Sequence, residues 1–371
     1  MHDDDIKKDP FEEYEKIKPS TKEELFYTWG TAIGLQKVDG LETSSYLKET
    51  VVRNLNGDIT LNQAREIIES YYTEDRKREN PKEAEADIVS TRIAELIDNK
   101  GFSFSVQEYL NIHKYLFEGV YKFAGKIRDY NISKKEWVLD NDSVTYGSSY
   151  NLLETLEYDF NEEKNFNYTK LTNSYDKVHR LAIFASRIWQ VHVFGEGNTR
   201  TTAVFLIKYL RSKGYNVSND LFKQNSWYFR NALVRANYTN EKKGISETTE
   251  YLEFFFRNLL LGEDNELKNR YMHIGFVKGQ KIIDNPIERL KEIYIFKMQG
   301  AKFLQKTINH TLSLFNEFGL TKVFGRNDVV NVLDITITPA TNYLKKLLEL
   351  GIIEPIKGFG KGKYKFNDSL K

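Results

Sequence analysis

The 371 residues include no cysteine. This absence excludes disulfide bonds and catalysis by a thiolate, and it fits a reducing cytoplasm. Long apolar runs are missing as well, since no uncharged stretch approaches the length of about 18 residues that a membrane-spanning helix needs. The chain opens on acidic residues where a secretory signal would be basic and then apolar. We therefore expect a cytoplasmic protein without a membrane partner.

The chain also lacks an excess of charge of either sign. Its 54 Lys and Arg residues balance 53 Asp and Glu residues, which leaves a net charge of +1. This balance gives no overall attraction to nucleic acid, so any binding of that kind must be local. With 40% hydrophobic and 29% charged residues, the composition is typical of a globular protein with a sizeable core. The length favours two or three units.

Changes in polarity along the chain indicate where these units meet. Residues 73–87 form a charge-dense stretch that contains a proline, which favours a boundary there. A second polar stretch, residues 262–270, follows the strongly apolar residues 254–261. We therefore predict an N-terminal helical segment, a central core and a C-terminal part, at residues 1–80, 85–262 and 263–371. In the N-terminal segment, residues 41–47 and 57–64 each read as a polar cap before a helical run.

Twelve consecutive residues, 192–203, bring together the groups that phosphate chemistry requires. They are a potential base, a carboxylate for a hard cation, two small residues whose amides can face an anion, and a guanidinium: His192, Glu196, Gly197, Asn198 and Arg200. Each feature alone has an ordinary explanation, because a single histidine is more often structural and a short glycine-rich stretch is more often a turn. The neighbouring segments, residues 178–191 and 204–210, are apolar with a helical pattern. A polar loop between two buried helices is costly unless it binds something.

The spacing of this loop resembles the signature HxFx[D/E]GNGRxxR of the Fic family, whose members transfer AMP from ATP to a protein hydroxyl. The resemblance implies that His192 deprotonates a Ser, Thr or Tyr of a target protein, and that Phe194 anchors the loop. It also implies that Glu196 holds Mg²⁺ against the phosphates of ATP. The residues that would bind the phosphates are Gly197, Asn198, Thr199 and Arg200.

Two positions depart from the family signature. Thr199 stands where the family usually has glycine, and Ala203 stands where it usually has a second arginine. In the family, that arginine holds the γ-phosphate, and in self-inhibited members it pairs with an inhibitory glutamate. Ala203 removes both interactions, so the loop alone does not define how ATP is positioned.

Two further segments resemble parts of a Fic core. Residues 102–133 resemble its opening, with a helical stripe that ends at Gly125 and a short hairpin predicted over residues 127–138. The resemblance implies that this hairpin is a flap on which a target chain docks as an added strand, whereas an ordinary surface hairpin is the alternative. In residues 225–238, the resemblance implies a pocket for the purine base formed by Tyr228 and Asn231, and the alternative is a role in the core.

The N-terminal segment resembles a small antitoxin that blocks some Fic toxins through the motif [S/T]xxxE[G/N]. The aligned residues here are Leu35, Asp39 and Gly40, so the hydroxyl is lost and the carboxylate is one methylene shorter. Since Ala203 also removes the arginine that such a glutamate would contact, we expect self-inhibition to be weak or altered. Thr91 to Glu95 fits the same motif in form, but their apolar neighbours favour a core helix.

The C-terminal residues resemble a winged helix-turn-helix. Helices are predicted over residues 325–333 and 338–350, with a turn at 334–336 between them and a two-stranded wing after them. Four lysines could contact DNA: Lys345, Lys346, Lys361 and Lys363. From residue 322 onward, nine Lys or Arg face five Asp or Glu, a modest excess for DNA binding. Domains of this kind also form contacts with proteins, including a second copy of the chain.

The sequence thus predicts a mainly α protein, with a Fic helical core that carries a short β-hairpin flap and a C-terminal winged helix-turn-helix. The leading function is Mg²⁺-dependent transfer of AMP from ATP to a hydroxyl of a target protein. The alternative is a DNA-binding regulator whose Fic core senses a nucleotide but catalyses poorly.

Overall fold

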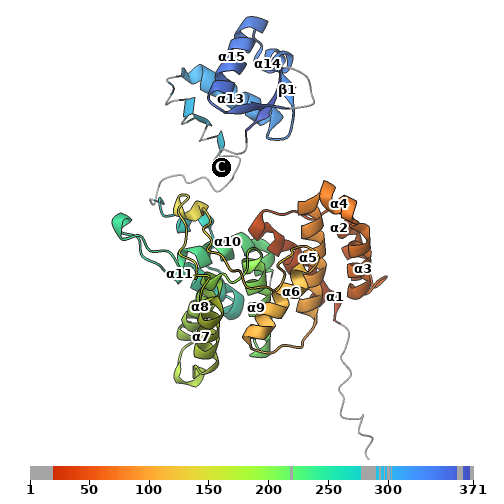
Figure 1. Ribbon diagram of the computed structural model, residues 1–371, viewed down its shortest axis with the longest axis vertical. Helices are drawn as coiled ribbons and strands as arrows, with labels where there is room; N and C mark the ends of the chain where they lie inside the picture. The colour runs from red at the N-terminus through yellow and green to blue at the C-terminus, as the bar shows by residue number, and fades with distance from the viewer. Residues whose placement is uncertain are drawn as a thin grey trace, which may run out of the picture. The chain divides into compact units, whose positions relative to one another are not determined.

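The computed structural model shows a mainly helical chain that divides into two compact units, residues 1–276 and 277–371 (Figure 1). The structure describes residues 20–217, 220–276, 290–291, 294–295, 297–298, 301, 303–356 and 362–367. Among these residues, none of the helices combines the length and apolar character that crossing a bilayer requires. The two units are described separately below.

The first unit begins with a group of helices from the N-terminal part of the chain. They are α1 (Lys22–Gly34), the short 3₁₀ helix η1 (Leu35–Asp39), α2 (Ser45–Leu55), α3 (Leu61–Tyr71), α4 (Glu74–Glu79) and α5 (Pro81–Asp98). Ser44 caps α2 and Thr60 caps α3 with their side-chain oxygens, which confirms the polar caps read from the sequence. At the end of α1, a Cβ on Gly34 would lie 2.5 Å from the Cα of Lys223. Glycine therefore allows η1 to begin close to the backbone of a later helix.

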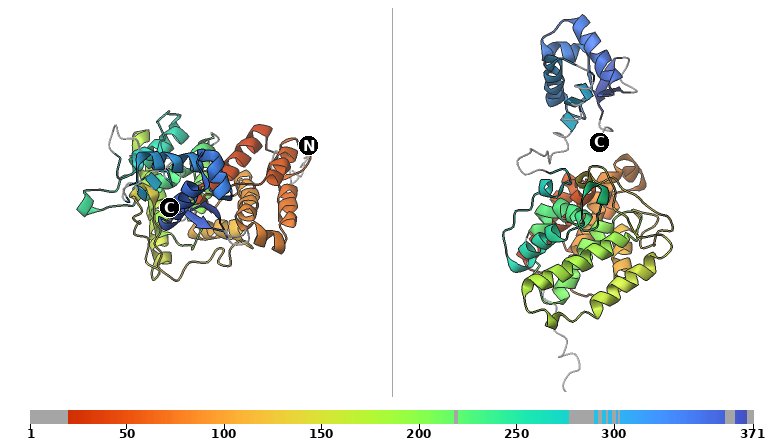
Figure 2. Two further views of the ribbon diagram at one scale, coloured as in Figure 1. Left: turned by 90° about the horizontal axis from the view of Figure 1, so that it is seen from above. Right: turned by 90° about the vertical axis from the view of Figure 1, so that its left-hand side faces the viewer.

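The helices of the Fic-like region follow in the same unit. They are α6 (Val106–Phe117), α7 (Leu152–Lys164), α8 (Ser174–Val191), α9 (Asn198–Ser212), α10 (Leu221–Arg235) and α11 (Glu250–Leu261), with the 3₁₀ helices η2 (Trp137–Leu139), η3 (Tyr168–Lys170), η4 (Glu241–Lys243) and η5 (Asn269–Met272). Helix α9 is buried from its first residue through Leu210 and packs against α5, α6 and α8. Figures 1 and 2 show it inside this group of helices. The phosphate loop predicted from the sequence therefore leads into the most enclosed helix.

The predicted boundary between residues 80 and 85 falls inside this unit. The charge-dense stretch forms α4 and the start of α5, and α5 packs against α1 and α3 on one side and against α6 and α9 on the other. One hydrophobic core includes residues from both parts. The unit also extends beyond the predicted boundary at residue 262, because η5 packs against α10 and the N–H of Ile274 donates to the carbonyl of Val138 at 3.0 Å.

The predicted flap has little regular strand. Helix α6 ends at Phe117, earlier than the predicted end at Gly125. The segment that follows is closed by a single antiparallel bridge between Glu136 and Asp142, around η2. Its position is fixed by Arg128, whose N–H donates to the carbonyl of Val193 at 2.9 Å. The flap is therefore held against the loop between α8 and α9.

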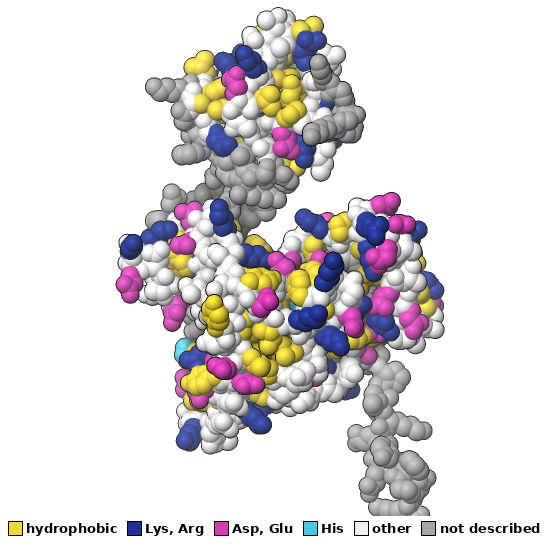
Figure 3. Space-filling view, viewed as in Figure 1, with side chains coloured by type: hydrophobic (Ala, Val, Ile, Leu, Met, Phe, Trp, Pro, Cys, Tyr) yellow, Lys and Arg dark blue, Asp and Glu magenta, His cyan; other side chains and the backbone are white. Residues whose placement is uncertain are grey.

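Charged side chains of both signs are interspersed over the N-terminal helices on the face shown in Figure 3. Apolar side chains gather over the middle of the first unit in the same view. That face presents no single-sign patch over these helices, in keeping with the balanced net charge.

The second unit contains three described helices and a small sheet. They are α13 (Gln305–Phe318), β1 (Phe324–Gly325), α14 (Arg326–Leu333), α15 (Ile337–Glu349), β2 (Ile353–Pro355) and β3 (Lys363–Phe366). The three strands are antiparallel in the order β1-β3-β2. The two helices predicted over residues 325–333 and 338–350 are confirmed to within one residue, although the N-cap of α15 is Thr336 rather than Thr338. A separate core, which includes Leu314, Phe324 and Phe366, holds the unit together.

Candidate active site

The predicted loop joins α8 to α9 through two residues with left-handed backbone. His192 ends α8 with φ 50° and ψ 54°, and Gly197 precedes α9 with φ 79°. A positive φ is uncommon for a residue other than glycine. The N–H of His192 donates to the carbonyl of Trp189 at 3.1 Å, and the Nε of Arg128 donates to the carbonyl of His192 at 2.7 Å. These bonds hold the histidine in a backbone conformation that it rarely adopts.

Aromatic side chains pack tightly against the loop. Phe194 is fully buried, as expected for an anchor, and its ring stacks on His113 at 3.6 Å between centroids. A Cβ on Gly197 would lie 2.4 Å from the ring of Phe117, so only glycine fits there. The side chain of Asn198 bonds to both the N–H and the carbonyl of Phe194, at 3.1 and 2.8 Å. Asn198 thus shapes the loop with its side chain.

His113 clamps the loop from α6. The N–H of Gly125 donates to its Nδ1 at 2.8 Å, so Nε2 carries the proton and donates to the carbonyl of Glu196 at 3.0 Å. Burial lowers the pKa of His113 to about 4. The neutral ring can therefore keep this pair of bonds at neutral pH.

The ring of His192 is arranged as a neutral base. Its Nδ1 lies 3.2 Å from the carbonyl oxygen of Trp189, so Nδ1 carries the proton and Nε2 keeps its lone pair. Burial lowers the pKa of His192 to about 3, and the positive charges of Lys134, Arg230 and Arg128 act in the same direction. The hydrogen bond to Trp189 opposes this shift but does not outweigh it. The ring is thus in the form that can accept a proton at Nε2.

The first turn of α9 offers backbone N–H groups to an anion. The N–H of Thr201 is bonded to the carbonyl of Gly197 at 3.0 Å, so the N–H groups of the three preceding residues have no partner within the helix. The hydroxyl of Thr199 is used elsewhere, since it accepts a hydrogen bond from the indole N–H of Trp189 at 2.9 Å. The threonine that replaces the usual glycine therefore braces α8, and it faces an anion only through its backbone.

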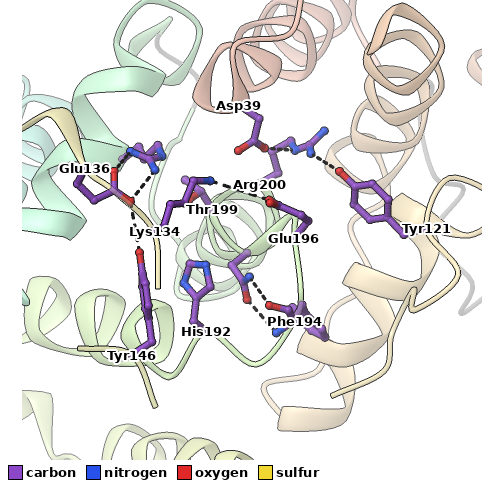
Figure 4. A network of polar contacts seen from close by, with 12 residues as sticks. Asp39, Tyr121, Lys134, Glu136, Tyr146, His192, Phe194, Glu196, Thr199 and Arg200 are labelled. Carbon is purple, nitrogen blue, oxygen red and sulfur yellow. Dashed lines mark hydrogen bonds and ion pairs between the residues drawn. The ribbon is translucent and has the colours of Figure 1, made fainter. Parts of the chain in front are cut away.

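Glu196 is the one acidic residue of the loop, and its carboxylate is exposed. Its side chain is 55% exposed and lies 4.0 Å from the amine of Lys134 on the flap (Figure 4). Among the residues that the structure describes, no group of three acidic or histidine side chains could enclose a metal ion. Mg²⁺ commonly takes one or two carboxylates and completes its shell with phosphate oxygens and water. An exposed single carboxylate fits that mode of binding.

Arg200 is fully buried and surrounded by acidic and polar groups from other elements. Its Nη2 donates to Glu85 at 2.6 Å, and its Nη1 donates to the side-chain carbonyl of Gln36 at 3.0 Å. Its Nε lies 2.8 Å from Asp39 Oδ2, as an ion pair without the geometry of a hydrogen bond (Figure 4). Burial acts to lower the pKa of Arg200, but the charges of Asp39, Tyr121 and Glu85 outweigh it and raise the pKa.

Position 203 offers Asp39 no arginine, as expected, because Ala203 is buried within α9. The structure brings Asp39 to Arg200 instead, a partner that the sequence did not indicate. Of the other two aligned positions, Leu35 is buried in the core and Gly40 ends η1 with φ 67°. The segment from Thr91 to Glu95 lies within α5, as its apolar neighbours indicated.

A second buried arginine lies beside the loop and was missed from the sequence. Arg230 on α10 donates to Glu136 on the flap through two hydrogen bonds, at 2.7 and 2.8 Å. The hydroxyl of Tyr146 donates to the same carboxylate at 3.3 Å, and the ring of Tyr146 lies 4.3 Å from that of His192 (Figure 4). The one sequence signal for Arg230 is a cation directly after three consecutive aromatic residues, 227–229.

The predicted base-pocket residues point elsewhere on α10. Residues two apart on a helix point about 200° from each other, so Tyr228 faces away from Arg230. The side chain of Asn231 donates to Asn269 on η5 at 2.8 Å. Both residues are buried, and neither the hydroxyl of Tyr228 nor Oδ1 of Asn231 has a hydrogen-bond partner among the described residues. Their role in base binding stays a prediction.

The lysines predicted to contact DNA lie in the second unit. Lys345 and Lys346 are exposed on α15, where the amine of Lys345 is 4.0 Å from Glu349. Lys363 on β3 forms an ion pair with Asp328 at 3.3 Å. Lys361 lies outside the described residues.

The loop, the helix that it leads into and the flap together form a helical site that combines a neutral histidine, an exposed carboxylate and the N-terminal N–H groups of a buried helix. Residues 103–210 match the sequence model of the Fic/DOC family, a match that spans α6 to α9 and the whole loop. The chain therefore contains a Fic/DOC family domain, and such domains typically transfer AMP or another nucleotide group to proteins. No curated protein matches the chain. Asp39, Glu85 and Arg230 all lie outside the matched residues.

The lowered pKa of His192 gives a testable expectation. An ordinary histidine is half protonated at about pH 6.5, whereas the ring of His192 should stay neutral, with its proton on Nδ1, down to about pH 5. Because the folded chain binds this proton more weakly than the unfolded chain does, His192 also makes the fold less stable as the pH falls below about 6.5. An NMR titration of ¹⁵N-labelled histidine rings measures both tautomer and midpoint. A midpoint near the ordinary value for His192 would contradict this description of the site.

Proposed function

We propose that the protein transfers AMP from ATP to a hydroxyl side chain of a target protein. The observation that carries this proposal is the neutral ring of His192, with Nε2 available, in the same loop as the N-terminal N–H groups of α9. A hydroxyl nucleophile needs a base, and a phosphate group needs fixed positive dipoles or charges. The Fic/DOC domain match supports the same chemistry.

In this reaction, Nε2 of His192 accepts the proton of the target hydroxyl as its oxygen attacks the α-phosphorus of ATP. The bond from that phosphorus to the bridging oxygen of the β-phosphate breaks, and pyrophosphate leaves. The N–H groups of the first turn of α9 face the phosphates, where the helix dipole favours negative charge. The exposed carboxylate of Glu196 would hold Mg²⁺, whose charge would offset that of the phosphates.

We also propose that the N-terminal segment restrains this reaction. A phosphate can use the guanidinium of Arg200 only if its present partners make room, and Asp39 and Glu85 are both carboxylates that compete for it. The pair with Asp39 lacks hydrogen-bond geometry, so it is the contact that exchanges more readily. Self-inhibition is therefore altered, because the inhibitory carboxylate of Asp39 pairs with Arg200 and not with an arginine at position 203.

The second unit supports a further candidate function, DNA binding through a winged helix. Helix α14, a three-residue turn and α15 are followed by the antiparallel strands β2 and β3, which is the order of elements in that fold. The face of α15 that carries Thr341, Asn342, Lys345 and Lys346 is exposed. These side chains suit contacts to phosphates and base edges. In this alternative, the Fic/DOC domain would sense a nucleotide for a DNA-bound regulator.

Transfer of AMP is tested by incubating the full chain with Mg²⁺, ATP labelled on the α-phosphate and a cell lysate. The variant His192→Ala should lower labelling by roughly 10² to 10⁴, because a general base contributes about that factor. Glu196→Ala should weaken the dependence on Mg²⁺. His179→Ala is the matched control, since His179 lies exposed on α8 and should label normally. Labelling by His192→Ala at the wild-type rate would reject the proposed base.

Restraint by Asp39 is tested with Asp39→Asn in the same assay. Removing one carboxylate charge that competes for Arg200 should raise the labelling rate about tenfold, which corresponds to a lost attraction of about 1.4 kcal/mol. Asp58→Asn serves as control, because Asp58 is an exposed acid of the same segment. An unchanged rate in a folded Asp39→Asn protein would show that Asp39 does not restrain the site.

DNA binding is tested by fluorescence titration of the full chain with duplex DNA over a series of salt concentrations. Replacing Lys345 and Lys346 by alanine should weaken binding and flatten the salt slope by up to about two units. Lys306→Ala with Lys322→Ala, two lysines outside α15, should leave the slope closer to that of the wild type. If the intact chain does not bind DNA even at low salt, DNA binding is rejected and protein contacts remain as the role of the second unit.

A further inference from the structure

The ion pair between Arg230 and Glu136 joins two elements that meet beside the catalytic loop. Arg230 comes from α10 and Glu136 comes from the flap, and their side chains are only 5% and 2% exposed. The guanidinium binds the carboxylate through two nearly equal hydrogen bonds. A buried charge pair of this kind is costly to form and is often no more stable than an apolar pair of the same size. A role beyond stability is therefore worth seeking.

Arg230 lies within electrostatic range of His192 and of Asp39, the carboxylate that pairs with Arg200. Its charge lowers the pKa of His192, after burial and together with Lys134 and Arg128. In turn, the charge of Asp39, which holds Arg200, acts to raise the pKa of Arg230. Contacts from Glu136 to Tyr146 and from Tyr146 to His192 connect the pair to the catalytic ring. The charge of Arg230 therefore acts on the base, and the charge of the η1 carboxylate acts on Arg230.

The loop itself supplies a single guanidinium for a nucleoside triphosphate such as ATP. Arg200 is that group, and position 203, one turn further along α9, carries the fully buried methyl group of Ala203. The triphosphate of ATP carries several negative charges, and arginine is the side chain that binds phosphate oxygens through two parallel hydrogen bonds. Arg230 already holds a carboxylate in that two-bond geometry. The same guanidinium can bind two phosphate oxygens in place of the two carboxylate oxygens of Glu136.

We propose that Arg230 is the second phosphate-binding arginine of this active site, and that it holds the γ-phosphate of ATP after exchanging its partner Glu136. This inference rests on the proposed function, because it takes ATP to be the nucleotide. The exchange moves no covalent bond, and one oxyanion replaces another on the same guanidinium. The ring of Trp227, 5.0 Å from that guanidinium, keeps the guanidinium oriented while its partner changes.

The exchange also couples nucleotide binding to the flap. Glu136 is bridged to Asp142 across the turn of the flap, and Lys134, two residues before Glu136, lies near Glu196. When phosphate replaces Glu136 on Arg230, the flap loses its buried ion pair with α10, while η2 still packs against that helix. A target chain then meets a flap that is held less firmly once ATP has bound.

The competing interpretation is that the pair only fastens the flap to α10. A purely structural pair affects stability but does not sense how many phosphates a ligand carries. The ratio of the affinities for ATP and ADP separates the two interpretations, because only ATP has the γ-phosphate that Arg230 would hold. Calorimetric titration of the full chain with Mg²⁺ and each nucleotide measures this ratio directly.

We expect Arg230→Gln to lower the affinity for ATP about tenfold or more relative to that for ADP, given that one arginine–phosphate interaction has been removed. Glu136→Gln should raise the affinity for ATP, because a neutral amide competes less for the guanidinium. Arg235→Gln is the matched control, because Arg235 is also a buried arginine of α10 but its side chain points in a different direction from that of Arg230. It should leave the ATP to ADP ratio unchanged, and thermal melting shows which variants fold.

Three results would overturn the inference. If the wild type binds ATP and transfers AMP but Arg230→Gln keeps the wild-type ratio, Arg230 does not hold the γ-phosphate, and the proposed function stands without it. If Arg230→Gln fails to fold, Glu136→Gln decides, because unchanged or weaker ATP binding by that variant contradicts the exchange. If the wild type neither binds ATP nor transfers AMP, the proposed function fails, and the role of Arg230 fails with it.

Discussion

The buried guanidinium of Arg200 is the constraint on which the arrangement of the first unit depends. A buried cation must have anionic or polar partners, because an unpaired charge in the interior costs several kcal/mol. Arg200 has Asp39, Glu85 and Gln36 as partners, of which Asp39 and Gln36 come from η1 and Glu85 comes from α5. The N-terminal helices therefore pack directly on α9, and the part of the chain before the Fic/DOC domain belongs to the same compact unit.

The same rule applies to the buried ion pair beside His192, whereas a second pair there is partly exposed. Arg230 is paired with Glu136, and Lys134 lies near Glu196. In each pair, the two charges come from different elements, so the charged groups that a nucleotide would contact are already balanced within the chain. Under the proposed function, nucleotide binding is an exchange of partners, in which phosphate replaces carboxylate on arginine. The affinity for the nucleotide would then depend on how firmly each internal partner is held.

The sequence predicted those parts of the fold and site that depend on neighbouring residues. Helix caps at Ser44 and Thr60, the helices of the second unit and the loop from His192 to Arg200 all follow from local patterns. The partner of Asp39 could not be found in this way, because it depends on how η1 meets α9. The orientation of α10 was also hidden, because its three consecutive aromatic residues, 227–229, point in directions about 100° apart. The family resemblance pointed to Tyr228 and Asn231, and Arg230 was missed.

The most direct measurement of this competition is hydrogen exchange in the backbone amides of η1 and α9, with and without Mg²⁺ and ATP. If phosphate displaces Asp39 from Arg200, amides of residues 35–40 should exchange faster when ATP binds. The first-turn amides of α9 should at the same time exchange more slowly, because they bind the phosphates. Slower or unchanged exchange in residues 35–40, together with protection of α9, would contradict the competition between the N-terminal carboxylates and the nucleotide.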